Sequence, residues 1–272
     1  MKDKWLRYGL IAVAVAIGVI VFNSREEQKE TFSPRDYAEI EESGILRAVT
    51  EYNRVSYHVD KDTLRGFDYE LLHAFAADKG LKPEMTPEMS FEERVSGVRQ
   101  GKYDILATGT VITTVSKDTL LFTHPILLSK QVLVQRRKKD DNDTTFIDSQ
   151  LGLAHKTLHV IKGSPALLRL HNLISEIADT VHIKEVDRYG PEQLLAMVAE
   201  GDIDYAVCEE NIANSAITQF PNLDIHIDIG FTQFYAWGVN KHSPVLLDSL
   251  NRWLDSYKKS RSFKQLYKKY FN

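Results

Sequence analysis

The sequence predicts an α/β protein with two lobes, each built on a doubly wound sheet, and a ligand cleft between them. In residues 101–125, a glycine that ends a helix precedes a short apolar run at 103–107, which is typical of a buried parallel strand. Small and hydroxylated residues follow this run. Residues 201–207 repeat the order of helix end, Gly-x-x-Asp and buried strand. Since α/β sheets bind ligands at the carboxyl ends of their strands, two equivalent strand ends predict two lobes facing one cleft.

The first lobe is expected to alternate strands and helices. A strand at 45–50 is followed by a loop and by a helix at 68–79, which has helically spaced apolar residues and ends at Gly80. After another strand, a helix at 91–100 leads into the strand at 103–107. The resulting order β-α-β-α-β is that of a doubly wound half-domain.

The second lobe is expected to follow the same plan. The first part of lobe 1 is expected to end with a strand at 131–135, and we interpret the polar residues 136–143 that follow as the surface connection to the second lobe. The later elements are a strand at 157–161, a turn at 162–165, a helix at 166–177, a strand at 181–185, a helix at 191–200 and a strand at 204–207. Residues 224–229 should then return the chain to the first lobe, which is completed by a strand at 234–239 and by helices at 245–257 and 262–271.

These elements divide the chain into five segments. They are an N-terminal membrane anchor or signal peptide at 1–24, a stalk with a short helix at 25–43, the first part of lobe 1 at 44–135, lobe 2 at 136–228 and the rest of lobe 1 at 229–272.

The N-terminal segment has the pattern of a membrane signal. Lys2, Lys4 and Arg7 flank an uninterrupted apolar run at 8–22, close to the lower limit of about 17 to 25 residues for a spanning helix. An uncleaved anchor and a cleaved signal peptide both remain open, and the absence of small residues at the end of the run favours the anchor. The basic residues keep the N-terminus in the cytoplasm in either case. We therefore expect a single-pass protein of the inner membrane with its binding domain in the periplasm.

The composition excludes some classes of function. The 272 residues are 43% hydrophobic, enough for a sizeable core, and the net charge of −4 argues against general nucleic-acid binding, which needs a basic surface. Cys208 is the only cysteine, so no intramolecular disulfide can form. Because it lies in an apolar strand, we interpret it as a small buried residue and not as a nucleophile.

The sequence contains no recognisable catalytic or metal-binding motif. Gly-x-Ser-x-Gly, Gly-x-Gly-x-x-Gly and P-loop patterns are absent. His155 and His159 are four residues apart, but on a strand that spacing separates them by about 13 Å, too far for one zinc ion. The carboxylates of Glu92-Glu93 and Glu209-Glu210 point apart on any regular element, so neither pair forms an acid/base couple. We expect no metal site and no cofactor.

Several segments of the chain resemble a known family. Residues 44–50, 66–71, 103–125, 201–209 and 238–244 are similar to the type II periplasmic solute-binding proteins, in particular to the amino-acid-binding branch, family 3. The resemblance covers residues 44 to 272. It implies two lobes that rotate about two hinge strands and so close around a ligand.

A narrower resemblance concerns the ends of the chain. The N-terminal anchor, Arg35-Asp36-Tyr37 and the Lys-Lys-Tyr-Phe sequence at 268–271 are similar to the non-catalytic binding domain of the membrane-bound lytic murein transglycosylase F family. In that family a glycan-cleaving domain follows the binding domain. Since the sequence ends at Asn272, we expect the catalytic glutamate of that domain to be absent from it. The resemblance thus favours a binding protein and leaves enzymatic activity uncertain.

The family resemblance also implies a set of ligand-binding residues. They are Glu51, Arg54 and Tyr57 on the first loop, Phe91 as a stacking wall, Thr108, Gly109 and Val111 as backbone or hydroxyl donors, and Lys162, Gly163 and Ser164 at a helix N-terminus. Glu209 stands where the family uses an aspartate to hold an amino group. A carboxylate suits that role because its hydrogen bonds to ammonium groups are strong in a desolvated cleft.

One position departs from the family pattern. Amino-acid binders carry an arginine after Gly109 that holds the carboxylate of the ligand, and this chain has Ser116 there, beside Lys117. Serine cannot form the bidentate contact of a guanidinium. Either Arg54 or Lys117 replaces it, or the ligand lacks a free α-carboxylate, as a peptide, a muropeptide or an amine would.

Three functions follow as hypotheses. The first is a membrane-tethered module that closes on an amino acid, a peptide or a cell-wall fragment and regulates or senses peptidoglycan turnover, with a murein-cleaving enzyme as partner. The second is the receptor of an amino-acid-type ABC transporter, with a permease as partner. The third is a transglycosylase relative whose catalytic domain lies elsewhere. Fold alone does not separate them, because function depends on the site.

Overall fold

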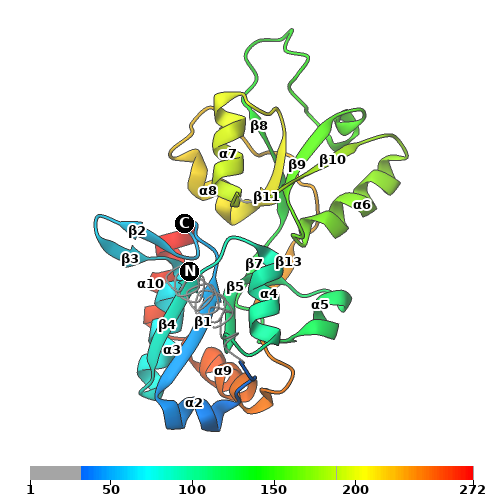
Figure 1. Cartoon of the computed structure of the whole chain (residues 1–272). Helices are drawn as coiled ribbons and strands as arrows, with labels where there is room; N and C mark the ends of the chain where they lie inside the picture. The colour runs from blue at the N-terminus through cyan, green and yellow to red at the C-terminus, as the bar shows by residue number, and fades with distance from the viewer. Residues whose placement is uncertain (1–31, 188, 272) are drawn as a thin grey trace, which may run out of the picture. The chain divides into compact units, whose positions relative to one another are not determined.

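The structure is a computed structural model that describes residues 32–187 and 189–271. Residues 33–272 form one compact unit, and the account below concerns that unit. Two sheets organise it, one in each lobe (Figure 1). The predicted two-lobed α/β fold is confirmed.

The first sheet has the strand order β4-β1-β5-β13-β6, and β7 pairs with β13. Strands β1, β4 and β5 run parallel, whereas β13 is antiparallel to β5, β6 and β7. The strands are β1 (Ile45–Thr50), β4 (Lys82–Pro87), β5 (Ile105–Val111), β6 (Leu121–Phe122), β7 (Leu127–Ser129) and β13 (Gln233–Val239). The helices of this lobe are α2 (Tyr37–Ser43), α3 (Phe67–Lys79), α4 (Phe91–Arg99), α5 (Thr114–Thr119), α9 (Pro244–Tyr257) and α10 (Arg261–Phe271). A hairpin of β2 (His58–Asp60) and β3 (Thr63–Arg65) extends from it.

The second sheet has the order β10-β9-β11-β8-β12. Strands β9, β10 and β11 run parallel, whereas β8 is antiparallel to β11 and β12. Its strands are β8 (Gln131–Arg136), β9 (Thr157–Ile161), β10 (His182–Val186), β11 (Ala206–Glu209) and β12 (Leu223–Asp224). Its helices are η1 (Gln150–Leu153), α6 (Ala166–Ile177), α7 (Pro191–Glu200) and α8 (Glu210–Ile217).

The repeated glycines have the predicted role. Gly101 and Gly201 follow α4 and α7 with φ of +80° and +89°, a left-handed conformation that side chains other than glycine rarely adopt. Each glycine therefore turns the chain out of its helix and toward the next strand. Strand β5 continues further than predicted, through Val111, because Thr110 and Val111 pair with Ala236 and Tyr235 of β13.

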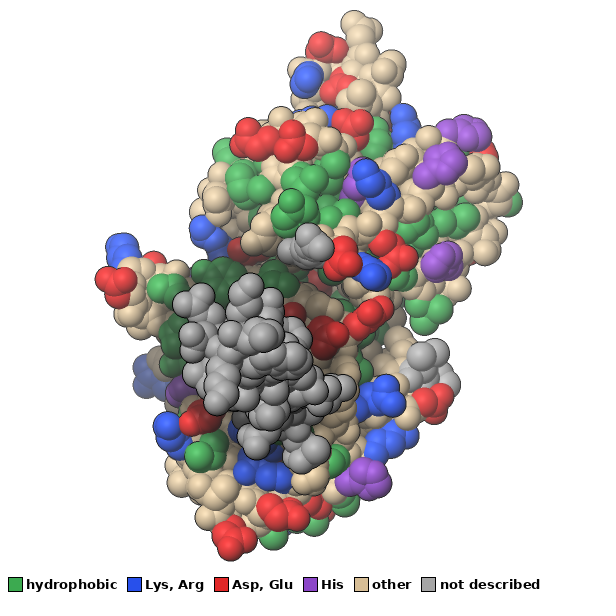
Figure 2. Space-filling model, in the orientation of Figure 1, with side chains coloured by type: hydrophobic (Ala, Val, Ile, Leu, Met, Phe, Trp, Pro, Cys, Tyr) green, Lys and Arg blue, Asp and Glu red, His purple; other side chains and the backbone are tan. Residues whose placement is uncertain are grey.

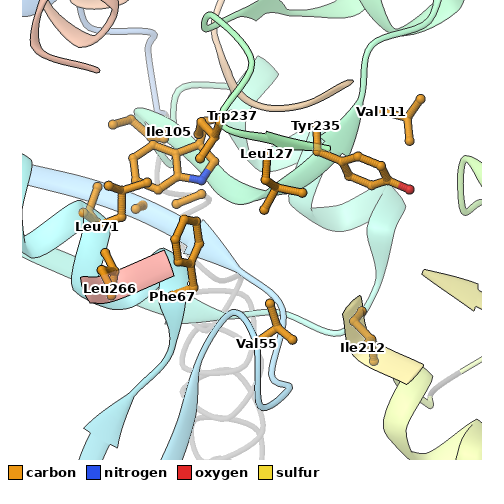
Figure 3. Close-up of a cluster of buried hydrophobic side chains, with 14 of the residues drawn as sticks. Val55, Phe67, Leu71, Ile105, Val111, Leu127, Ile212, Tyr235, Trp237 and Leu266 are labelled. Atoms are coloured by element: carbon orange, nitrogen blue, oxygen red, sulfur yellow. The ribbon is translucent and has the colours of Figure 1, made fainter. Parts of the chain in front are cut away.

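Aromatic and aliphatic side chains fill the core beneath the first sheet. Trp237, Phe67 and Leu71 are fully buried and lie against one another, with Leu266 of α10 beside them (Figure 3). Four aromatic residues of α10 also surround the Phe67 ring with edge contacts. The C-terminal helix thereby fixes the start of α3, and with it one wall of the cleft.

The chain crosses between the lobes at a different place from the one expected. Residues 131–135 were assigned to the first lobe, but β8 pairs with β11 and β12 of the second sheet. Leu223 and Asp224 also pair with β8, and the chain returns toward the first sheet after Asp228. A fully buried apolar strand has the same sequence pattern in either sheet, so the pattern could not assign it.

The expected location in the membrane needs correction. Within residues 32–187 and 189–271, no helix is long and apolar enough to cross a membrane. The longest helix there, α9, has 14 residues, which corresponds to about 21 Å, whereas the hydrocarbon layer is about 30 Å thick. The candidate anchor at 1–24 lies outside the described residues, and the prediction of a single-pass membrane protein is not supported.

Candidate ligand-binding cleft

A cleft opens between the two sheets. Its walls come from the loop after β1, the start of α3, β5, α4 and β13 on one side, and from β9, the start of α6 and β11 on the other. Figure 2 shows acidic and apolar side chains where the two lobes meet. The polar side chains that line the cleft are Glu51, Ser56, Asp68, Arg94, Thr108, Thr110, Gln131, Ser164, Glu209 and Tyr235.

Two adjacent chain segments connect the lobes at the base of this cleft. The Gln131 side chain donates to the Tyr235 hydroxyl at 2.9 Å, which joins β8 of one sheet to β13 of the other. Figure 3 shows the Tyr235 hydroxyl pointing away from the core around Trp237. Lys130 on the first crossing forms an ion pair of 2.8 Å with Asp228 on the second. The two crossings are thus held together and form a hinge for the lobes.

Glu51 and Arg94 form a buried ion pair in the cleft. The Arg94 Nη2 lies 2.9 Å from Glu51 Oε1, and the two residues are only 4% and 8% exposed. Arg94 also donates to the carbonyls of Glu88 and Met89, whereas its buried Nε–H has no partner among the described residues. Asn53 donates to the other oxygen of Glu51. The pair therefore contributes no net charge but leaves one donor unused.

Asp68 is a second carboxyl group in the cleft, and it is 3% exposed. The indole Nε1–H of Trp237 donates to its Oδ1 at 2.7 Å, so the core of the first sheet orients this side chain. Burial raises the pKa of Asp68 to about 7, although hydrogen bonds from Trp237 and Ser56 oppose the shift. A nearby cation would favour the ionised form.

Glu209 is the third carboxyl group, and it lies at the carboxyl end of β11. Its side chain is partly accessible to solvent, but desolvation raises the pKa of Glu209 to about 8, and the charges of Asp68 and Glu51 raise it further. The Asn211 side chain donates to Oε1 at 3.2 Å. Three carboxyl groups therefore face a single guanidinium, and a cationic group would relieve this imbalance.

The structure brings together most of the residues predicted to bind the ligand. Seven of them line the cleft: Glu51, Phe91, Thr108, Gly109, Val111, Ser164 and Glu209. Lys162 lines a separate pocket with Asp187, and Tyr57 packs edge-on against the rings of Tyr52 and Tyr69. Gly163 lines a neighbouring pocket, and its backbone N–H donates to the Glu185 carboxylate.

Arg54 and Ser116 have other contacts. The Arg54 backbone N–H donates to Glu192 Oε1 at 2.6 Å and its guanidinium to Gln219 at 2.8 Å, so the residue bridges the two lobes. The Ser116 hydroxyl accepts the Thr113 N–H at 2.8 Å and completes a capping box at the start of α5. Neither residue lines the acidic cleft.

The sequence analysis missed Arg94, Asp68, Gln131 and Tyr235. Arg94 stands in the charged stretch Glu92-Glu93-Arg94, which is typical of a solvated helix face. Asp68 follows Gly66 and Phe67, at a position where an acidic residue usually caps or starts a helix. Asp68 and Gln131 stand at the starts of elements that face the cleft, and this position could have identified them, whereas the local sequence gives no such signal for Arg94 and Tyr235.

The described residues contain no group of three or more His, Cys, Asp and Glu side chains that could hold a metal ion. His159 is buried and its Nδ1 lies 3.2 Å from the Tyr205 carbonyl, and His155 lies beside Asp179. Cys208 is buried, and burial raises the pKa of its thiol well above the usual range. A thiol in this environment is a poor nucleophile.

Comparison with known proteins gives consistent results. The model of the bacterial extracellular solute-binding proteins, family 3, matches residues 46–272. Among solved structures, an ancestral arginine-binding protein bound to arginine is 26% identical with a TM-score of 0.73, covering 84% of this chain and 99% of that one. The ancestral amino acid-binding protein AncCDT-1, a precursor of cyclohexadienyl dehydratase, is 25% identical with a TM-score of 0.74, covering 86% and 99%.

The similar curated proteins are larger than this chain. Membrane-bound lytic murein transglycosylase F of Desulfosudis oleivorans is 29% identical over 264 residues, which cover 96% of this chain and 55% of the relative. The protein of the same name from Pseudomonas putida is 27% identical over 241 residues, covering 88% and 48%. The chain therefore spans about half the length of the curated relatives that it matches.

Proposed function

The chain belongs to family 3 of the bacterial extracellular solute-binding proteins, and we propose that its cleft binds a small solute with a positively charged amino group. The observation that carries this proposal is the charge imbalance of the cleft. Glu51, Asp68 and Glu209 face it, and Arg94 is the one cationic side chain among its described lining residues. An ammonium group between Asp68 and Glu209 would form charge-assisted hydrogen bonds and stabilise both ionised carboxylates.

The ligand-binding residues extend beyond the carboxylates. Phe91 offers a ring at the wall of the cleft, and Thr108 and Ser164 offer hydroxyl groups from opposite lobes. The buried Arg94 Nε–H, which lacks a partner among the described residues, offers one donor for a neutral or anionic group of the solute. Closure of the lobes about the hinge at Lys130 and Asp228 would enclose the solute.

We further propose that the solute is a peptide or a cell-wall fragment, and that binding regulates peptidoglycan turnover through a murein-cleaving partner. Similarity to lytic murein transglycosylase F over 88% to 96% of the chain supports this role. The capping role of Ser116 also supports a ligand without a free α-carboxylate, because no guanidinium stands at that position.

The alternative is a substrate receptor of an amino-acid ABC transporter, with a permease as partner. Similarity to an arginine-binding protein and to an ancestral amino acid-binding protein supports it. A receptor of this kind should prefer free amino acids, whereas a regulator of cell-wall turnover should prefer peptides or muropeptides.

A thermal-shift screen tests the proposal. The protein is heated with free amino acids, amino acid amides, short peptides and muropeptides, since a ligand that binds the folded state raises the apparent Tm. We expect amine-bearing compounds to raise the Tm and their N-acetylated forms to have no effect. The class that gives the largest shift decides between the two roles.

Substitution of Glu209 links any such shift to the cleft. Glu209→Ala should abolish the shift by amine ligands without lowering the Tm of the free protein. Glu200→Ala, which removes an exposed glutamate from α7, serves as the control and should behave like the wild type. Equal binding by the wild type and Glu209→Ala would remove Glu209 from the site, and a response to acetylated ligands would disprove recognition of the amine.

A further inference from the structure

A second cavity adjoins the acidic cleft, and we call it the apolar annex. It lies where α4, α5 and the strands β5 and β6 of one lobe face the start of α6 in the other (Figure 1). Most of its walls are apolar side chains, among them Phe91, Val95, Leu106, Leu120, Phe122 and Leu168.

The described walls of the annex carry no charge. They consist of aliphatic and aromatic side chains with a few hydroxyl groups, in contrast to the three carboxyl groups of the cleft. An apolar group gains free energy by leaving water for such walls. A carboxylate buried there would lose its hydration and find no cation in exchange, which is costly. The annex therefore selects for an uncharged, apolar group.

The cleft and the annex are continuous. Phe91, Thr110, Val111, Ser164 and Pro165 line both of them. The Ser164 hydroxyl stands at this junction, buried and without a hydrogen-bond partner among the described residues. A single ligand can thus contact the carboxyl groups with one end, pass the Ser164 hydroxyl and enter the annex with the other.

The two spaces also differ in size. The acidic cleft has a cavity volume of about 90 Å³ and the annex one of about 390 Å³. The cleft suits a small head group such as an ammonium, whereas the annex can hold the larger part of a ligand. Ser116 lines the annex at the position where the family resemblance implies an arginine. The annex therefore contains no guanidinium from that position.

We propose that the ligand is an amine whose apolar group occupies the annex while its ammonium lies among Glu51, Asp68 and Glu209. This inference rests on the proposed function, because the ammonium anchors the ligand in the same cleft. It adds that the ligand carries no carboxylate on the part that enters the annex. A hydrocarbon amine and a short peptide with an apolar side chain both have this chemistry.

Amines of increasing length test the proposal. Dissociation constants of methylamine, butylamine and hexylamine are measured by NMR titration at pH 8, where a primary amine is still protonated. Each methylene that enters the annex should tighten binding by roughly fourfold. The amine 6-aminohexanoate, which ends in a carboxylate, should bind far more weakly than hexylamine. A comparison of leucinamide with glycinamide shows whether a peptide-like ligand is accepted as well.

A matched pair of variants locates the effect. Leu168 is 50% exposed, lines the annex and does not line the acidic cleft, so Leu168→Gln should leave the fold and methylamine binding intact. It should reduce the preference for hexylamine over methylamine several-fold. Leu151, which is 72% exposed and lies in another pocket of the same lobe, supplies the control Leu151→Gln, which should change neither constant.

The outcomes separate this inference from the proposed function. If methylamine binds, depends on Glu209 and gains nothing from a longer chain, the annex is disproved and the amine site stands. An unchanged preference in Leu168→Gln, or equal binding of 6-aminohexanoate and hexylamine, also overturns the annex. If no amine binds at all, both proposals fail.

Discussion

At the scale of single residues, the acidic side chains of the cleft are destabilising to the free protein. Asp68 and Glu209 have raised pKa values, about 7 and about 8, mainly because burial disfavours their ionised forms. In the unfolded chain both groups ionise near their ordinary values of 3.8 and 4.5. At neutral pH the folded protein therefore keeps most of the Glu209 proton and about half of the Asp68 proton, both of which the unfolded chain would release. A cation bound in the cleft, as we propose, would replace those protons.

This imbalance predicts how stability depends on pH. Between about pH 4 and pH 8 the unfolded chain binds fewer protons than the folded protein, so the free energy of unfolding falls as pH rises and levels off above pH 8. The loss is on the order of several kcal/mol for each of the two groups. Chemical denaturation of the ligand-free protein at pH 5, 7 and 9 and constant ionic strength measures it.

Two variants test the source of the pH dependence. Glu209→Gln removes one ionisable carboxyl group, and Asp68→Asn removes the other while keeping an oxygen that accepts from the Trp237 indole. Each should flatten the decline in stability between pH 5 and pH 9. A decline of the same size in both variants would show that other groups cause it.

At the scale of elements, the loop after β1 forms a further connection between the lobes. Arg54 on this loop donates from its backbone to Glu192 in the first turn of α7, and from its side chain to Gln219 just beyond α8. Desolvation raises the pKa of Glu192, as expected for a carboxyl group that the facing loop partly covers. These contacts hold the lobes together independently of the ligand.

The bridge predicts an effect on the opening of the lobes. Glu192→Ala removes the acceptor of the Arg54 N–H, so the lobes should separate more often and the radius of gyration of the ligand-free protein should increase. Glu192→Gln keeps an acceptor oxygen and should remain close to the wild type. Small-angle X-ray scattering measures the change, and Glu200→Ala on the exposed end of the same helix is the control. Identical scattering curves for all four proteins would show that the bridge does not hold the lobes.

At the scale of the whole compact unit, one lobe is inserted into the other. The chain leaves the first sheet after β7 and returns to it with β13, which lies between β5 and β6. The ends of the inserted segment are adjacent, because Lys130 pairs with Asp228 and Val132 pairs with the same residue across a β-bridge. The first lobe, in contrast, needs chain from both sides of the insertion, including Trp237 of its core.

This arrangement predicts which part folds alone. Residues 130–230 contain a complete sheet, its helices and a buried core of their own, so this fragment should unfold cooperatively on heating. Residues 33–129 lack β13, α9 and α10, so this fragment should not unfold cooperatively. Circular dichroism melting curves of the two fragments and of residues 33–271 measure this. A cooperative transition in fragment 33–129, or none in 130–230, would contradict the prediction.

The local pattern of the sequence predicted the elements and their class. Gly101 and Gly201 indicated helix ends, because only a residue without Cβ adopts a positive φ readily, and the apolar runs after them indicated buried strands. The position of Thr108 in the cleft followed from the rule that ligands lie at the carboxyl ends of strands, whereas the positions of Glu51 and Glu209 were implied by the family resemblance. These features depend on a few neighbouring residues, and a single sequence is sufficient to identify them.

Tertiary structure alone decided which side chains meet. Asp68 and Trp237 are 169 residues apart and Glu51 and Arg94 are 43 apart, so no local pattern indicates that they form pairs. The sheet to which β8 belongs was equally undetermined, since a buried strand looks the same in either lobe. The sequence by itself therefore determined two lobes with a ligand site between them. Only the packed structure decided the charge balance of the cleft and the apolar annex, because burial and charge are properties of the neighbours that folding brings together.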